Sequence, residues 1–308
     1  MDLRRLRILR ELADRGSVGA TAEAMNITPS AVSQQLKVLQ DEVSVVLVRR
    51  EGRGVKLTEA GLAMAAAGAE VSTAMERAQA TVDFYRKGWQ TQIRAAFFPS
   101  SAEMFLPGLL HRIKEIPGLQ FDAFHEDPMV SGFVPLTADY DFVVAHGSPG
   151  ADVFSQPGVV VVPLLKEPLD VAMPTTHPLA GKAGLTPEDV VDYTWIGVPE
   201  GFPFDSILAQ VEARTGRRVT RSQRYPDLRV MEALVSAGHG LAFLPRYTAL
   251  GSGGRGYVLR PLEGVSASRS IVALARPDIA ERTTIQQVLG LLKRVAQNVA
   301  DDVEMVES

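Results

Sequence analysis

The chain has 308 residues, no cysteine, 46% hydrophobic residues and a formal net charge of −4. The absence of cysteine excludes disulfides, thiolate zinc sites and iron–sulfur clusters, and the length suits two ordinary domains or three small ones. The N-terminus lacks the apolar stretch of a signal peptide, and no apolar run is long enough to cross a bilayer, so we expect a soluble, cytoplasmic protein with no membrane contact. Residues 1–57 carry more basic than acidic residues, whereas residues 91–308 carry more acidic ones. This asymmetry favours a polyanion contact at the N-terminal end.

The first 43 residues contain three helical patterns. Leucine at every third position predicts a helix over residues 2–14, Ser17 or Thr21 can cap a second helix near 19–25, and TPSAVSQQLKVLQDE predicts a third from residue 28. Two helices joined by a three- or four-residue turn form a helix-turn-helix, in which the second helix is the candidate recognition helix.

The third helix has two distinct faces. Thr28 can cap it and Pro29 suits its first position. Its buried stripe consists of Val32, Leu36, Leu39 and Val43. Its opposite face carries short hydrogen-bonding side chains and almost no acid, namely Ser30, Ser33, Gln34 and Lys37. Such side chains can read base edges or hold a phosphate, although an ordinary solvated face remains the alternative.

A basic hairpin follows the third helix. The run Val45–Val48 predicts a strand, residues 51–54 a turn and Val55–Leu57 a returning strand. The hairpin would form a wing, in which Arg50 and Arg53 contact phosphate or the minor groove. The alternative for both residues is solvated surface charge.

Residues 58–87 continue as one long Ala-rich helical pattern. About 30 residues at about 1.5 Å each span roughly 45 Å. We interpret this helix as a linker and a pairing surface.

From residue 92 onward strands and helices alternate, which favours mostly parallel sheets with helices on their faces. Two such sheets, with the chain crossing between them near residues 163 and 267, would make two lobes around a cleft. We expect lobe I over about 91–163 and 268–300, and lobe II over about 164–267. The expected strands include 93–98, 120–124, 140–145, 159–164, 169–173, 195–198, 219–224, 241–244, 257–260 and 270–275.

The order of these parts resembles the LysR-type transcriptional regulators. The N-terminal segments that carry the resemblance are residues 22–25, TPSAVSQQLKVLQ at 28–40 and VVLVRREGRGVKLTEAG at 45–61; the C-terminal ones are IRAAFFPSSAEMFLPGLL at 93–110, DYDFVVAHG at 139–147 and AGHGLAFLP at 237–245. Three residues depart from the family pattern: Gln40 replaces Glu, Ser44 replaces Gly and Val48 replaces Phe. Ser44 would strain a turn that prefers a positive φ.

The resemblance implies a fold, a domain division and a function. The fold is an N-terminal all-α winged helix-turn-helix (1–57) plus a long linker and dimerisation helix (58–90), then a C-terminal α/β two-lobed effector domain like a periplasmic binding protein (91–308). The function is DNA-binding transcriptional regulation under a small-molecule effector, such as a carboxylate or amino-acid-like metabolite. The partners would be double-stranded DNA with an interrupted palindromic operator and further copies of the chain, as a homodimer or homotetramer.

Hydroxyl and aromatic residues mark the expected effector site. Ser100 and Ser101 start the helix after strand 93–98, where unpaired N–H groups make a natural seat for a carboxylate; simple capping is the alternative. The resemblance places the remaining lining at His146, the loop 199–204, residues near Tyr225–Asp227, and Phe243. Phe98, Phe202 and Phe204 indicate an apolar group beside the charged one, with core packing as the alternative. Asp127 and Asp205 could instead favour a cationic ligand, so the ligand's charge stays open.

Enzyme motifs find no support. GSGGRG at residues 251–256 fits the dinucleotide pattern, but no clear strand precedes it and no helix follows. The five histidines show no ligand spacing, so we expect no catalytic residue, metal or cofactor. The alternatives are a two-lobed small-molecule-binding protein or enzyme with an incidental helix-turn-helix, and an architectural DNA binder.

Overall fold

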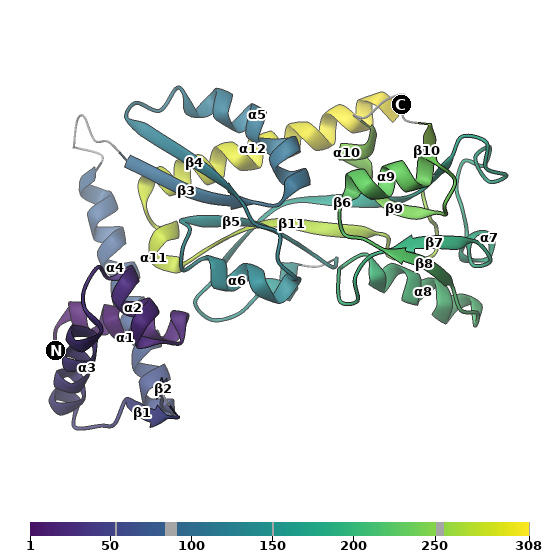
Figure 1. The fold of residues 1–308 in the computed structure, drawn as a ribbon. Helices are drawn as coiled ribbons and strands as arrows, with labels where there is room; N and C mark the ends of the chain where they lie inside the picture. The colour runs from purple at the N-terminus through teal and green to yellow at the C-terminus, as the bar shows by residue number, and fades with distance from the viewer. Residues whose placement is uncertain (53, 84–90, 150, 251–255, 308) are drawn as a thin grey trace.

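The structure is a computed structural model that describes residues 1–52, 54–83, 91–149, 151–250 and 256–307. A small N-terminal head and a long helix lie at one end of an elongated two-lobed domain (Figure 1). The prediction of a winged helix-turn-helix followed by a two-lobed α/β domain is confirmed. The domain boundaries at residues 57 and 90 stay predictions.

The head contains the three expected helices, α1 (Leu3–Arg15), α2 (Val18–Ala24) and α3 (Pro29–Val43). Each begins at a side-chain cap: Asp2, Ser17 and Thr28 accept a hydrogen bond from a first-turn N–H. Their apolar faces form one core, and Val32, Leu36 and Leu39 of α3 belong to it. The recognition helix is therefore fixed by packing on one face, which leaves its polar face outside.

The wing differs from the expected strand positions. Its strands are β1 (Val48–Glu51) and β2 (Gly54–Leu57), paired antiparallel with Val48 opposite Leu57. The expected strand over Val45–Val48 is wrong, because the Gln40 side-chain oxygen accepts the N–H groups of Leu47 (2.8 Å) and Val48 (2.9 Å). Gln40 thus holds the chain in place just before the ladder begins. Ser44 has the positive φ of 54° that its position predicts.

The long helix α4 (Glu59–Asp83) packs against α1 of the head and against α11 (Pro277–Ala280) of the effector domain. It starts at a close approach, since a Cβ at Gly61 would lie 2.0 Å from the carbonyl oxygen of Leu47. The predicted continuation to residue 87 falls outside the described residues. Four large apolar side chains of α4 are exposed: Leu62, Val71, Met75 and Val82.

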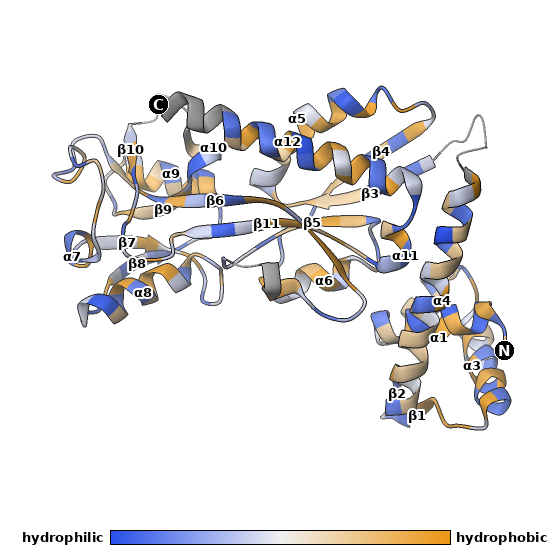
Figure 2. Cartoon of the chain, turned by 180° about the vertical axis from the view of Figure 1, so that it is seen from behind, coloured by the Kyte–Doolittle hydropathy of each residue, from blue (hydrophilic) through white to orange (hydrophobic). Residues whose placement is uncertain are grey.

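Lobe I is built on a mixed sheet. Its elements are β3 (Thr91–Phe97), α5 (Pro99–Ile113), β4 (Leu119–His125), η1 (Val130–Gly132), α6 (Phe133–Leu136), β5 (Phe142–Gly147), η2 (Ala151–Phe154) and α12 (Thr283–Glu307). Figure 2 shows hydrophobic colour along β5 and alternating colours along α12. These are the patterns of a strand covered on both faces and of a helix with one buried face.

Lobe II contains the remaining short elements. They are α7 (Pro187–Val190), β7 (Thr194–Gly197), α8 (Asp205–Thr215), β8 (Thr220–Arg224), α9 (Leu228–Ser236), β9 (Ala242–Pro245), α10 (Arg246–Leu250) and β10 (Tyr257–Arg260). Strands β7 and β8 pair in parallel as a separate two-stranded sheet.

Two long strands connect the lobes. β6 (Val160–Pro174) and β11 (Ser268–Ala275) pair antiparallel with each other, and the main sheet has the order β10-β6-β11-β5-β3-β4 with β9 on β6. The expected separate strands 159–164 and 169–173 are therefore one strand, and the expectation of mostly parallel sheets is wrong. The crossing strands run in opposite directions, so the pairings around them are antiparallel. No helix among the described residues is both long and apolar enough to span a membrane.

Candidate functional site

The polar face of α3 is free to meet a ligand. Thr28, Pro29, Ser30, Ser33, Gln34 and Lys37 are all exposed. The Thr28 hydroxyl caps the helix and lies 2.9 Å from that of Ser30, while Ser33 donates to the Pro29 carbonyl at 3.0 Å. Gln34 and Lys37 make no hydrogen bond or ion pair with any described residue. Their side chains therefore keep their full capacity for base edges or phosphate.

The wing adds positive charge beside α3. Arg50 is exposed on β1, and it has no acidic partner within the described ranges. Lys56 of β2 pairs with Glu51 at 3.5 Å. Arg53 lies outside the described residues, so its predicted DNA contact stays a prediction.

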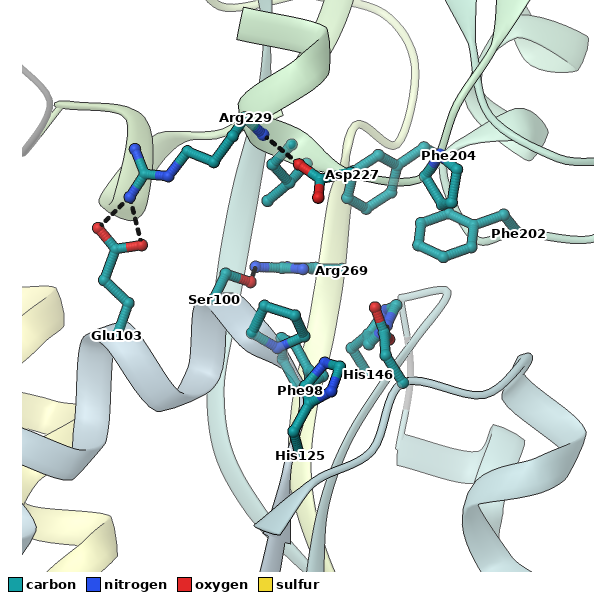
Figure 3. A pocket seen from close by; sticks show the side chains of 14 residues that line it. Phe98, Ser100, Glu103, His125, His146, Phe202, Phe204, Asp227, Arg229 and Arg269 are labelled. Atoms are coloured by element: carbon teal, nitrogen blue, oxygen red, sulfur yellow. Dashed lines mark hydrogen bonds and ion pairs between the residues drawn. The ribbon is translucent and has the colours of Figure 1, made fainter. Parts of the chain in front are cut away.

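A cavity of about 290 Å³ lies between the two lobes (Figure 3). Five of the eight predicted effector-binding residues line it: Phe98, Ser100, His146, Phe202 and Phe204. They come from distant parts of the sequence: Phe98, Ser100 and His146 meet because β3 and β5 are neighbours in the sheet, and Phe202 and Phe204 come from lobe II.

Arg269 of β11 is the central polar group of this cavity. Its side chain is only 2% exposed, and its Nε and Nη2 atoms contact Glu167 at 2.8 and 2.6 Å. Nη2 also donates to the Ser100 hydroxyl at 2.8 Å. Nη1 makes no hydrogen bond to any described residue, so two N–H donors remain for a ligand.

Glu167 neutralises this arginine from the opposite crossing strand. Arg269 and Glu167 are direct register partners of β11 and β6, and Glu167 is fully buried. Burial raises the pKa of the Glu167 carboxyl, while the Arg269 guanidinium and backbone N–H groups of α10 counteract that rise. The pair thus fixes the orientation of Arg269 at the point where both crossing strands pass from one lobe to the other.

His146 is buried among aromatic rings at the floor of the cavity. Its ring centroid lies 4.5 Å from that of Phe98 and 5.4 Å from those of Phe133 and Phe202. Nε2 lies 3.3 Å from Asp127, whereas buried Nδ1 lacks a hydrogen-bond partner among the described residues. Burial lowers the pKa of His146, so the ring is neutral at neutral pH.

An ion pair bridges the mouth of the cavity. Arg229 of α9 donates to both carboxylate oxygens of Glu103 on α5, each at 2.7 Å (Figure 3). The two residues belong to different lobes, so this contact is broken when the lobes separate. Both side chains are about half exposed, and solvent screening therefore weakens the pair.

Other predicted residues lie outside the cavity lining. Ser101 is buried and donates to the Phe98 carbonyl at 2.7 Å; Phe243 is buried 4.7 Å from the Trp195 ring. Tyr225 is 47% exposed and does not line the cavity. Asp205 instead lies near Arg221 and Arg224 at 3.5 and 3.7 Å.

Sequence reasoning missed the polar lining residues Glu103, His125, Arg229 and Arg269. Arg269 had a usable indication, because it is a lone charge in the strand SRSIVALA, which otherwise reads as buried. No comparable pattern marks Glu103 or Arg229, since both lie on amphipathic helices where charge is ordinary. Within the described ranges, no group of three or more His, Asp or Glu side chains is arranged to hold a metal ion.

A winged helix-turn-helix joined by a long helix to a two-lobed domain with a cavity between its lobes defines a ligand-responsive DNA-binding protein. Two family models match the chain: "Bacterial regulatory helix-turn-helix protein, lysR family" over residues 3–62 and "LysR substrate binding domain" over residues 86–297. The chain belongs to the LysR family of transcriptional regulators. It is a DNA-binding regulator with an effector-binding domain and not an enzyme, so the enzyme alternative is not favoured.

One relative illustrates the similarity in sequence, and two solved structures illustrate the similarity in fold. The transcriptional dual regulator GltC of Bacillus subtilis is 27% identical over 272 residues, which cover 88% of this chain and 89% of GltC. Full-length OxyR from Pseudomonas aeruginosa superposes with a TM-score of 0.66 at 20% identity, covering 96% of this chain and 97% of OxyR. Full-length CbnR in complex with its target DNA gives a TM-score of 0.51 at 20% identity, covering 96% and 100%.

Proposed function

We propose that this regulator binds an interrupted palindromic operator as a homodimer or homotetramer, with residues 1–57 as the DNA-binding head. Gln34, Ser30 and Ser33 contact base edges, while Lys37 and Arg50 contact phosphates, with Thr28, Pro29 and Arg53 beside them. The support is the exposed polar face of α3, which makes no competing contact through Gln34 or Lys37. Short side chains near the start of a recognition helix suit the major groove.

The pairing surface is α4, within the linker and dimerisation segment 58–90. Val71, Met75 and Val82 are exposed at spacings of 4 and 7 residues, which places them on one stripe. A stripe of exposed apolar side chains on a long helix is typical of a helix–helix interface. Pairing of two α4 helices would fix the distance between two recognition helices, as an interrupted palindrome requires.

The effector is a small carboxylate or an amino-acid-like metabolite that binds in the cavity between the lobes. The observation that carries this proposal is Arg269, a buried guanidinium with an unused Nη1 in the cavity. Its planar fork suits a carboxylate, and the adjacent start of α5 lacks a side-chain cap. Phe98, Phe202 and Phe204 would contact the apolar part of the ligand, and Asp127 would contact an ammonium group if one is present.

Regulation then follows from the difference between the effector's affinities for the closed and the separated lobes. A ligand that contacts Arg269 of the crossing strand and Phe202 of lobe II stabilises the closed lobes relative to separated ones. It shifts the population of regulator states only by the difference in its affinity for them.

A thermal-shift screen of the full-length protein against carboxylates and amino acids tests this proposal. We expect at least one compound to raise the melting temperature, and we expect the rise to vanish when Arg269 and Glu167 are both replaced by Met. The matched control is Arg217→Met, which removes an exposed ion pair with Asp192 in lobe II and should leave the response intact. A response that survives in the double variant would contradict the assignment of Arg269.

A further inference from the structure

The head docks onto the effector domain of its own chain through a cluster of charged residues. We name this cluster the head lock. It consists of four residues of α1 and three of the effector domain: Arg10, Glu11, Asp14, Arg15, Asp139, Arg276 and Asp278.

At the centre of the head lock, each side of the interface contributes one arginine, which pairs with acidic residues of the other side. Arg10 of the head contacts Asp278 at 2.8 Å, while Arg276 of the effector domain contacts Glu11 at 2.9 Å and Asp14 at 3.3 Å. Arg10 and Glu11 are only 6% and 4% exposed. Arg276 lowers the pKa of the Glu11 carboxyl against the opposing effect of burial. These charges are therefore shielded from solvent and paired across the interface.

The rim of the head lock adds further contacts. Arg15 reaches Asp139 at 2.7 Å and the Ala138 carbonyl at 2.6 Å. Nearby, α4 pairs with the effector domain through Arg77 and Glu281 at 2.7 Å. Because the contacts come from α1 and α4 together, they fix both the position and the rotation of the head.

The head lock is not a continuation of a hydrophobic core. The buried apolar cluster of the head, which runs from Leu6 to Ala65, shares no residue with the described apolar clusters of the effector domain. Two open cavities of about 840 and 680 Å³ flank the charges; Asp14 lines both, Arg276 the first and Arg10 the second. Water and salt can thus reach the rim of the head lock, where the side chains of Asp14 and Asp139 are 33% and 55% exposed, while its centre stays shielded.

We propose that the head lock is a salt-sensitive docking device that holds the head against its own effector domain and thereby fixes the direction of α3. When the lock opens, the head reorients together with α4, with which it shares an apolar core, while both domains stay folded. Buried ion pairs give little net stability over apolar contacts but are geometrically demanding. Such pairs therefore suit a junction that has one defined closed state and can still be released.

The absence of cysteine from the chain gives a direct test. Spin labels at Glu23→Cys on α2 and Lys293→Cys on α12, both exposed positions without a partner among the described residues, report the distance between head and effector domain. Double electron–electron resonance is recorded on full-length protein co-expressed with excess unlabelled chain, so that intrachain distances dominate. The lock variant is Arg10→Gln/Arg276→Gln. The matched control is Arg246→Gln, which breaks a comparably buried pair with Asp170.

The expected result is one narrow distance distribution for the unmodified sequence and for Arg246→Gln in 50 mM NaCl. The narrow distribution should be lost in the lock variant and also, without any substitution in the lock, in 1 M NaCl. The variant Arg10→Lys/Arg276→Lys keeps both positive charges, and it should recover part of the narrow population at low salt. A narrow distribution that survives both 1 M NaCl and the lock variant would overturn the proposal, as would a broad distribution in the unmodified sequence at low salt.

Discussion

Arg269 and Arg276 lie at the two ends of one strand, β11, and face two different functional regions. Arg269 is the second residue of β11 and lines the cavity between the lobes, while Arg276 directly follows the strand and pairs with Glu11 of the head. Arg269 and Arg276 are seven positions apart along an extended strand, which places them roughly 23 Å from each other. β11 is paired on both sides, with β5 and β6. A shift of this strand on effector binding would therefore reach the head lock directly.

The Arg269–Glu167 pair should dominate the stability of the hinge between the lobes. Replacing Arg269 with Met leaves a fully buried carboxylate without its cation, and we expect the free energy of unfolding to fall by about 3–5 kcal/mol. The double variant Glu167→Met/Arg269→Met removes both charges and should regain at least roughly half of that loss. Urea unfolding of the three proteins measures both effects. If the double variant is no more stable than the single one, the unpaired carboxylate is not the cause.

His146 should make the protein less stable below neutral pH. Burial lowers its pKa in the folded state below the ordinary value of 6.5, so in mild acid the unfolded chain takes up a proton that the folded chain does not. At pH 5.5 this difference costs at most about 1.4 kcal/mol relative to pH 7.5, the limit reached when the folded chain takes up no proton at His146. His146→Phe removes the titrating group and should lose less stability across this range.

Urea unfolding at pH 7.5 and 5.5 for both proteins provides the comparison. His177 also has a lowered pKa because of partial burial, but it is present in both proteins and cancels. Equal pH dependence in the two proteins would show that the pKa of His146 is the same in the folded and unfolded states, which would contradict the effect of burial.

Gln34 and Lys37 should have separable effects on DNA binding. Gln34→Ala removes a bidentate group from the base-reading face, and we expect a change of preferred operator with a loss of about 1–3 kcal/mol at the cognate site. Lys37→Ala should weaken all sequences alike and reduce the slope of log K against log salt by about 1. Binding-site selection followed by titrations at several salt concentrations distinguishes them. A uniform loss for Gln34→Ala would contradict its role in sequence recognition.

Ser44→Gly should stabilise the head. Ser44 adopts φ 54° and ψ 30° at the end of α3, a left-handed conformation that costs a residue with a side chain more than it costs glycine. We expect a gain of about 0.5–1 kcal/mol in the free energy of unfolding, since part of the benefit is offset by the greater freedom of glycine in the unfolded chain. Thermal unfolding compares the two proteins, with Asn26→Gly as a second left-handed position in the same head. No gain at Ser44 would mean that its local contacts already compensate the strain.

Local patterns predicted the helices of the head well because the sequence of each helix contains a capping residue and a stripe of apolar side chains. Thr28 caps α3 as expected, and Val32, Leu36 and Leu39 of its predicted stripe are buried. The first strand of the wing begins later than predicted because its start depends on a side-chain contact. The Gln40 side chain accepts hydrogen bonds from the N–H groups of Leu47 and Val48. No periodicity in residues 45–48 contains that information.

The lining residues of the cavity were predictable only where the local sequence pattern indicates a role for their residue type. Ser100 follows from the start of α5, Phe98 directly precedes that helix, and Phe202 and Phe204 lie in the predicted loop 199–204. Arg229 and Glu103 meet only because α5 and α9 lie on opposite sides of the cavity mouth. Contacts between elements more than 100 residues apart depend on the topology of the crossing strands, and that topology was expected to be mostly parallel.

The most direct test of the whole account is quantitative DNase footprinting of the full-length protein on the DNA upstream of its own gene, across a range of salt concentrations. We expect two protected half-sites on one face of the duplex and a binding constant that falls steeply with salt. The protection pattern should change when the stabilising effector from the thermal-shift screen is added. Protection that is absent, or that is equal on a scrambled sequence, would contradict operator recognition. Protection that the effector leaves unchanged would contradict its control by the cavity.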